Sequence, residues 1–310
     1  MDPIEALGLP DSRWVNVGGP VHYRMWDGPR EGPTFVCVHG LGGSLLNWAP
    51  VAPGLARRGR VLALDLAGFG LTQPEERGTG VGSNRKLLDR FLRELDLPPV
   101  VLVGNSMGGM VSLIQAAHAP QSVKALVLVD AAFPRTRSMH GQFDPRIASI
   151  FALYNTRWLG EWLADLRRRR LGPEGLVRET LRVAAADPSS IDPLLVRAMI
   201  EQARTRQSLG YATRAFLDAA RSIFRAQVAP GRYRSLVRSI TRPALVMHGA
   251  RDRLIPVGTA REAAANHPNW KLVVIDDLGH IPQMEAPGRW LAEVEQWLDE
   301  GRENDRAETG

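Results

Sequence analysis

The chain has 310 residues, of which 44% are hydrophobic and 23% are charged, and its formal net charge is +6. This balance supplies enough apolar surface for a sizeable core and excludes a disordered chain, a collagen-like repeat and a disulfide scaffold. Cys37 is the only cysteine, so no internal disulfide can form. The first residues do not resemble a signal peptide, and no stretch approaches the roughly 18 apolar residues of a membrane-spanning helix. We therefore expect a globular protein of the cytoplasm.

Positive charge is concentrated in one part of the chain. Between Pro134 and Arg238 there are 19 arginines and 9 acidic residues, whereas the remainder has 20 basic and 24 acidic residues. A positive surface here would attract an anionic substrate, an acidic partner or an anionic membrane. No nucleic-acid-binding module accompanies the charge, so nucleic acid is not expected as a partner. The sequence leaves the oligomeric state open.

Strands and helices alternate along most of the chain. The first two expected strands, Trp14–Val17 and Val21–Trp26, are separated by a turn at residues 18–20. Six short and continuously apolar segments follow, as is typical of strands covered on both faces: Thr34–Val38, Val61–Leu64, Val100–Val103, Ala125–Val129, Ala244–Met247 and Leu272–Ile275. Helices are predicted between them at Arg85–Leu95 and Met107–His118, and near the end at Gly288–Leu298. This order predicts βαβ crossovers and a mostly parallel, doubly wound sheet.

The alternation stops at Phe133-Pro134 and resumes at Arg242-Pro243, and the convincing segments in between are all helical. We therefore expect a helical lid inserted before the last two strands. The predicted α/β core comprises residues 1–133 and 239–300, and the predicted cap comprises residues 134–238. The polar tail at residues 301–310 lacks periodicity and is expected to be disordered.

A nucleophile motif lies between the strand that ends at Val103 and the helix that begins at Met107. The segment Gly104-Asn105-Ser106-Met107-Gly108 has the Gly-x-Ser-x-Gly pattern, whose small flanking residues leave room for a sharp, strained turn. Such a turn lifts the serine hydroxyl out of the sheet and directs the N-terminus of the next helix at the reacting centre. We predict that Ser106 is the nucleophile.

A serine hydroxyl needs a base that is oriented by an acid. Among the seven histidines, His280 lies in the loop after the last apolar strand, where an open α/β sheet presents functional groups. The acid is expected between nucleophile and base along the chain. Asp252 fits that order in the loop after Ala244–Met247, and Asp130, at the end of an earlier strand, is the competing candidate.

The oxyanion of an acyl-transfer intermediate has to be met by preorganised backbone N–H groups. Met107, directly after the nucleophile, is expected to supply one of them. The glycine-rich segment His39–Ser44 follows an early strand, and its Leu41 is the predicted second donor, with Gly42 as the alternative.

Together these segments resemble the α/β-hydrolase fold serine hydrolases, of the esterase and lipase kind. The resemblance rests on His39–Gly43, Asp65–Gly70, Gly104–Gly109, His248–Pro256 and Gly279-His280, and it spans residues 34–287. It implies a catalytic triad of Ser106, Asp252 and His280. In that family the Asp65 segment is a structural turn beside the site. No metal, nucleotide or organic cofactor is implied.

The motifs also narrow the substrate class. Haloalkane dehalogenases and epoxide hydrolases of this fold carry Asp where Ser106 stands. The Ser106 turn is similar to that of C–C bond hydrolases acting on meta-cleavage products of aromatic degradation, but those enzymes usually have a bulky aromatic residue in place of Ile281. We expect hydrolysis of small-molecule esters with apolar acyl or alcohol groups. C–C bond cleavage and a non-catalytic, ligand-binding relative are the alternatives.

An amphipathic helix is predicted in the cap over Arg157–Leu166, ahead of Arg167–Arg170. Its apolar side carries two tryptophans and three leucines: Trp158, Leu159, Trp162, Leu163 and Leu166. One interpretation is a lid helix that associates with an anionic membrane surface. The favoured interpretation is a cap helix that packs its tryptophan face over the substrate pocket, with the arginines complementing the helix dipole.

Overall fold

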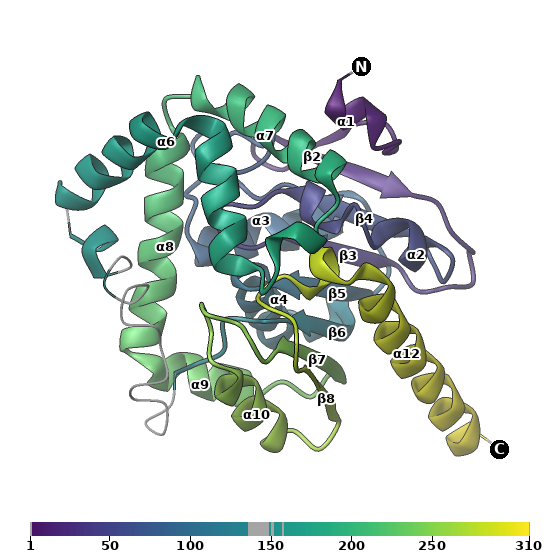
Figure 1. Cartoon of the computed structure of the whole chain (residues 1–310). Coiled ribbons are helices and arrows are strands. Elements are labelled where there is room, and N and C mark those ends of the chain that lie inside the picture. The colour runs from purple at the N-terminus through teal and green to yellow at the C-terminus, as the bar shows by residue number, and fades with distance from the viewer. Residues whose placement is uncertain (1, 136–148, 150–151, 157, 310) are drawn as a thin grey trace.

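The central sheet of the protein has eight strands (Figure 1). The computed structural model describes residues 2–135, 149, 152–156 and 158–309. The strands are β1 (Arg13–Asn16), β2 (Pro20–Trp26), β3 (Phe35–Val38), β4 (Val61–Leu64), β5 (Val100–Asn105), β6 (Val123–Val129), β7 (Ala244–Gly249) and β8 (Trp270–Ile275). Their order across the sheet is β1-β2-β4-β3-β5-β6-β7-β8. The β1–β2 and β2–β4 pairs are antiparallel and the other neighbours are parallel, which confirms the mostly parallel sheet.

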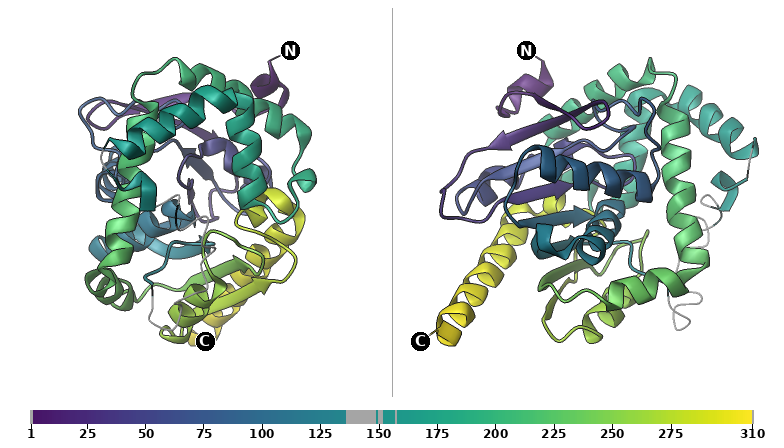
Figure 2. Two further views of the ribbon diagram at one scale, coloured as in Figure 1. Left: turned by 60° about the vertical axis from the view of Figure 1, so that its left-hand side comes forward. Right: turned by 180° about the vertical axis from the view of Figure 1, so that it is seen from behind.

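Helices flank this sheet and also form the cap. Those outside the insertion are α1 (Pro3–Ala6), α2 (Ala52–Ala56), α3 (Val81–Glu94), α4 (Met107–His118), α10 (Val257–Ala265), α11 (Pro282–Glu285) and α12 (Pro287–Thr309). Those between β6 and β7 are α6 (Leu159–Ala184), α7 (Pro193–Gln207), α8 (Ala212–Val228) and α9 (Pro230–Arg238). The views in Figure 2 show the cap helices at one end of the molecule and α12 projecting from the other.

Both faces of the sheet are covered, as the continuous apolar strands predict. Alternate residues of β3 separate into two hydrophobic clusters: Val36 and Val38 pack on one face, and Phe35 and Cys37 pack on the other. All four side chains are fully buried. Because successive side chains of a strand point to opposite faces, a strand with two packed faces has to be apolar at every position.

The helical insertion lies between β6 and β7, ahead of the last two strands, as expected. Within the predicted cap, residues 136–148, 150, 151 and 157 lie outside the described residues. The long helix α6 is interrupted at Gly172, whose φ of +60° and ψ of −177° are not helical, and Pro173 follows directly. We call Trp158–Leu171 the outer arm of α6. In Figure 1 the outer arm lies at the periphery, away from the sheet.

The outer arm corrects one expectation. Trp158 is 81% exposed and Trp162 is 59% exposed, so these side chains do not pack over a substrate pocket. The described part of the predicted helix begins at Leu159, after Trp158 in a left-handed conformation. An amphipathic pattern reports an apolar stripe but not what covers it, which is why the sequence alone gave the wrong preference.

The helix α12 continues through residues 301–309, the segment for which the sequence predicts a disordered tail. Elongation of an existing helix adds a hydrogen bond for each residue that is ordered, and Arg, Glu and Ala are good helix formers. None of the described helices combines the length and apolarity that crossing a membrane requires.

Candidate active site

Ser106 occupies the turn between β5 and α4, which is the strand-turn-helix context that its motif requires. Its φ of +54° and ψ of −116° are a strained conformation for a residue other than glycine. Three hydrogen bonds hold this backbone. The Ser106 N–H donates to the Val129 carbonyl at 3.0 Å, and the Ser106 carbonyl accepts from the N–H groups of Ala132 and Met110, both at 3.1 Å. Position 108 has room only for glycine, because a Cβ there would lie 2.0 Å from the Val38 carbonyl oxygen.

The side chains of Asp252 and His280 form a buried pair, with 2.7 Å between Asp252 Oδ2 and His280 Nδ1. The second oxygen of Asp252 accepts from the N–H groups of Leu254 at 2.7 Å and Ile255 at 3.1 Å. Burial by itself would raise the pKa of Asp252, but the neighbouring rings of His280 and His248 and the Ile255 N–H lower that pKa overall. The carboxylate is therefore ionised and oriented, as an acid that aligns an imidazole has to be.

The His280 loop is fixed at its backbone from two sides. The His280 N–H donates to the carbonyl of Ala184, the last residue of α6, at 2.7 Å. The His280 carbonyl accepts from the side-chain amide of Asn105 at 3.0 Å. Asn105 directly precedes Ser106, so the loop with the predicted base lies against the turn with the predicted nucleophile.

Glu285 strengthens the same junction between the cap and the His280 loop. One oxygen of the buried Glu285 carboxylate accepts from the Gly279 N–H at 3.0 Å, and the other accepts from the Ala186 N–H at 2.7 Å. Burial raises the pKa of Glu285, and these two N–H groups oppose that rise. Glu285 could not be singled out from the sequence, because its position five residues after His280 carries no catalytic signal.

The contact between Ser106 and His280 stays a prediction. The Ser106 hydroxyl makes no hydrogen bond to any residue that the structure describes. Because Asp252 takes Nδ1 of His280, Nε2 is the nitrogen that is left to receive the hydroxyl proton. Bonds of this kind are often long until a substrate is bound.

The predicted oxyanion loop lies directly beside the nucleophile turn. A Cβ at Gly40 would be 3.2 Å from the Cβ of Ser106, so the two backbones approach closely. In the described part of the chain, neither the Leu41 N–H nor the Met107 N–H has a hydrogen-bond acceptor. Gly42 has a φ of +74°, and a Cβ there would contact the ring of Phe216 from α8 at 3.4 Å. Two free N–H donors beside a serine are what an oxyanion hole needs.

His39 holds this loop in place and does not serve as a base. Its Nδ1–H donates to the Gly40 carbonyl at 2.8 Å, and its Nε2 accepts from the Leu66 N–H at 3.0 Å. Burial lowers the pKa of His39, and the ring is neutral with both nitrogens occupied. Asp65 has a structural role in the adjoining turn, where it accepts from the Leu45 N–H and the Leu71 N–H, both at 2.8 Å.

Asp130, the competing acid, lies beside His248 and the backbone of Gly249. One oxygen accepts from the Gly249 N–H at 2.9 Å and is 3.5 Å from His248 Nε2, whereas the other is buried without a partner among the described residues. Asp252 Oδ2 lies 3.4 Å from the same Nε2 of His248. Burial and the charge of Asp252 raise the pKa of Asp130 well above its ordinary value, whereas the pKa of Asp252 is lowered, so Asp130 is the one of the two that holds a proton more readily.

Donor atoms of Asp130, His248 and Asp252 lie within 4.8 Å of one another, a spacing that a metal ion could use. Two of these groups already have other partners. Asp252 is bonded to His280, and His248 donates its Nε2–H to the Ile255 carbonyl at 3.0 Å. The arrangement fits a hydrogen-bonded network better than a ligand set, and we assign no metal to it.

Arg206 brings a positive charge to the junction of cap and core. Its guanidinium lies 5.4 Å from the centroid of the Phe69 ring and donates to the Gly68 carbonyl. Phe69 in turn packs edge-to-face on His39 at 5.6 Å. Buried atoms of two neighbouring side chains, Arg206 Nε and the Tyr211 hydroxyl, have no partner among the described residues. Arg206 could not be singled out from the sequence, because one arginine among 19 in the segment carries no signal.

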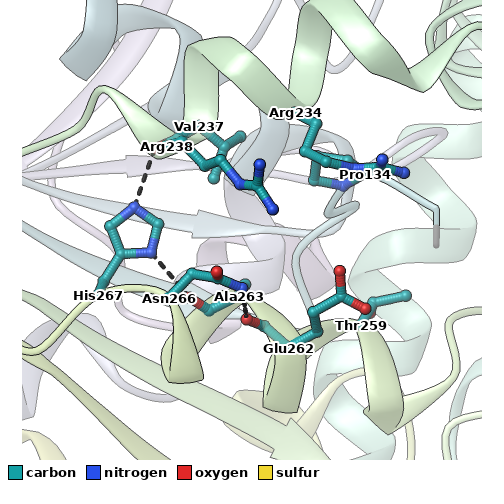
Figure 3. A pocket seen from close by; sticks show the side chains of 9 residues that line it. All are labelled: Pro134, Arg234, Val237, Arg238, Thr259, Glu262, Ala263, Asn266 and His267. Carbon is teal, nitrogen blue, oxygen red and sulfur yellow. Dashed lines mark hydrogen bonds between the residues drawn. The ribbon is translucent and has the colours of Figure 1, made fainter.

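A separate small hollow lies between α9 and α10 (Figure 3). It holds about 30 Å³, room for one or two water molecules. Its lining residues are Pro134, Arg234, Val237, Arg238, Thr259, Glu262, Ala263, Asn266 and His267. None of the predicted triad or oxyanion residues contributes, so this hollow is not the active site.

Several known proteins are similar to this chain. It is 31% identical over 277 residues to the dihydrolipoyllysine-residue acetyltransferase component of the acetoin cleaving system of Pseudomonas putida, and it spans 63% of the length of that protein. It is 30% identical to the uncharacterized hydrolase YugF of Bacillus subtilis, with 92% of this chain and 96% of YugF covered. It is 28% identical to a 2-hydroxy-6-oxo-2,4-heptadienoate hydrolase of Pseudomonas putida, with 86% and 89% covered.

The fold is shared with solved structures. A putative lipase of Acinetobacter baumannii superimposes with a TM-score of 0.75 at 23% identity, covering 97% of this chain and 95% of the lipase. A model of the alpha/beta hydrolase fold family matches residues 33–287, the range that contains Ser106, Asp252 and His280. The chain belongs to the α/β-hydrolase fold family and is a hydrolase of that class.

Proposed function

We propose that the protein is a serine hydrolase that cleaves carboxylic esters with apolar acyl or alcohol groups. The observation that carries the proposal is the 2.7 Å pair of Asp252 and His280, set beside the strained turn of Ser106. An imidazole that a carboxylate orients is the base that a serine nucleophile needs, and the Asn105 amide joins the His280 loop to the residue before Ser106, which supports the proposal.

The reaction proceeds in two halves. Ser106 Oγ attacks the ester carbonyl while its proton passes to His280 Nε2, and the ionised Asp252 stabilises the imidazolium. The N–H groups of Leu41 and Met107 bind the oxyanion of the tetrahedral intermediate. His280 then gives its proton to the departing alcohol, which leaves an acyl group on Ser106. Water attacks this acyl-enzyme while its proton passes to His280, and His280 then returns the proton to Ser106 Oγ as the bond to the acyl group breaks and the acid is released.

An apolar substrate is favoured by what lies next to the oxyanion loop. The ring of Phe216 from the cap stands over Gly42, and Leu41 packs against the hydrophobic core. A polar acyl chain placed there would lose its hydration without gaining hydrogen-bond partners.

The test is hydrolysis of p-nitrophenyl esters of graded acyl length, run beside labelling with a fluorophosphonate. Wild-type protein should turn over and become labelled, and Ser106→Ala should lose both. Turnover by folded Ser106→Ala would refute the assignment of the nucleophile. Wild-type protein that neither turns over any ester nor becomes labelled would favour the non-catalytic, ligand-binding alternative.

A second candidate function, C–C bond hydrolysis of meta-cleavage products, is favoured by Arg206. An enclosed guanidinium with an unpartnered Nε suits the carboxylate of an acidic substrate. One relative, the heptadienoate hydrolase of Pseudomonas putida, is named for a substrate of that kind. Assay of a meta-cleavage product with wild-type protein and Arg206→Met separates the candidates. Turnover of the acid that is lost in the variant, with ester turnover retained, would favour C–C bond cleavage.

A further inference from the structure

The outer arm of α6 carries most of the exposed apolar side chains of the described structure. The described residues include six large hydrophobic side chains that are exposed. Four of the six belong to the outer arm: Trp158, Leu159, Trp162 and Leu171. The other two, Trp14 and Val228, lie on different elements. Scattered single residues of this kind need no explanation, but Trp158, Leu159 and Trp162 lie together at the beginning of the arm and form a patch. Leu171 follows Trp162 by nine residues, about two and a half turns, and so projects from the opposite side of the helix.

Unpaired positive charge lies on the same arm. Each acidic side chain of α6 is already paired with an arginine: Glu161 with Arg221, Asp165 with Arg168, Glu174 with Arg178 and Glu179 with Arg167. Arg169 and Arg170 are exposed and have no ion pair within the described residues. The outer arm therefore presents a positive charge that nothing in the described protein neutralises.

One tryptophan and one of the unpaired arginines face the same way. Trp162 and Arg169 are seven residues apart, which is close to two turns of helix, so they project from one side about 10 Å apart along the axis. The Arg221 guanidinium holds the beginning of the arm, because it donates to Glu161 at 2.8 Å and to the Tyr154 carbonyl at 3.1 Å. The arm is thus a fixed surface of the cap.

We propose that the outer arm of α6 is a docking surface for an anionic lipid membrane. Tryptophan rings lie at the level of lipid headgroups, and arginines beside them meet the negative charge of the headgroups. The occupant is a lipid surface in preference to a second protein, because three apolar side chains accompanied by unpaired arginines offer a small, charged patch. A stable protein interface usually buries about 1,200–2,000 Å² with a core depleted of charge. The proposal does not depend on the proposed ester hydrolysis.

The experiment is flotation of the full-length protein with vesicles of phosphatidylglycerol and phosphatidylcholine in equal parts, and with vesicles of phosphatidylcholine alone. Binding is expected to the anionic vesicles and to fall as salt is raised, since screening shortens the reach of the charges. The double variants Trp158→Ser with Trp162→Ser, and Arg169→Gln with Arg170→Gln, should each weaken binding about tenfold or more. Ser106→Ala should bind like wild type, which separates docking from catalysis.

Matched controls lie on the core. Trp14→Ser removes an exposed tryptophan outside the arm. The double variant Arg13→Gln with Arg30→Gln removes two exposed arginines outside the arm. Neither control variant should change binding to the vesicles. All the replaced residues are exposed, so thermal melts should be nearly unchanged. The proposal is overturned if wild type does not float with anionic vesicles, if both vesicle types bind equally, or if the arm variants bind like wild type. A dimer in sedimentation that is lost in the Trp158 and Trp162 variant would assign the face to self-association instead.

Discussion

The side-chain amide of Asn105 donates to the backbone carbonyl of His280 at 3.0 Å and to the backbone carbonyl of Val129 at 3.1 Å. Asn105 is buried and directly precedes Ser106. One side chain therefore connects the nucleophile turn, the end of β6 and the loop of the predicted base. The distance between base and nucleophile depends on this connection.

We predict that Asn105→Ala lowers kcat by roughly 10- to 100-fold with a smaller effect on KM, because a displacement of about 1 Å between reacting groups can cost that much. Steady-state kinetics on a p-nitrophenyl ester measure the change. Asn84→Ala is the control, since Asn84 is also buried and also makes two bonds to backbone, at Thr79 and Ala67. A similar loss of stability in both variants with equal kcat would contradict the positioning role.

The two acids near His280 should differ sharply on substitution. Asp252→Asn removes the charge that fixes the tautomer of His280, and kcat should fall by roughly 10³–10⁴-fold. Asp130→Asn replaces a carboxyl whose raised pKa disfavours the charged form, and it keeps the oxygen that accepts from Gly249, so kcat should stay within about tenfold of wild type. Measurement of kcat for both variants decides between the two candidates, and the reverse ranking would assign the acid to Asp130.

The dependence of stability on pH tests the state of Asp130 without any substrate. Burial and the charge of Asp252 raise the pKa of Asp130 in the folded protein above its unfolded value of about 3.9. Between these values the unfolded chain has released the proton and the folded chain has kept it, so the free energy of unfolding falls as pH rises. Asp130→Asn removes that loss. Urea unfolding from pH 4 to pH 8 should show the variant gaining stability relative to wild type, and a flat or opposite difference would contradict a raised pKa.

Much of the fold could be predicted because each of its local sequence patterns is compatible with only one kind of structural element. Strands such as β3 are apolar at every position because both faces are packed, and the interruption between Phe133 and Arg242 marks the cap. The pairing of Asp252 with His280 followed from chain order and from the loops at strand ends. Their catalytic roles and that of Ser106 stay predictions until the kinetics are measured.

What could not be predicted depends on contacts between distant segments. The exposure of Trp162 is set by which elements the cap leaves uncovered, and periodicity does not report that. Glu285 becomes important only because residues 184–186 at the end of α6 lie against it. Arg206 differs from the other cap arginines only in where α7 places it, over the Phe69 ring.

The close approach of α4 to β3 gives a last prediction. A Cβ at Gly108 would lie 2.0 Å from the Val38 carbonyl oxygen and 2.6 Å from the His39 carbonyl oxygen, so Gly108→Ala has to push the helix away from the strand. We expect a loss of about 1–3 kcal/mol in the free energy of unfolding, together with lower kcat, because Ser106 and the oxyanion loop move apart. Gly82→Ala in α3 is the matched control. A Cβ there has nothing within 4 Å, and the change should stabilise the helix by about 0.5–1 kcal/mol. Urea unfolding of the two variants measures both changes in stability. A Gly108→Ala variant as stable and as active as wild type would contradict the close approach of α4 to the backbone at Val38 and His39.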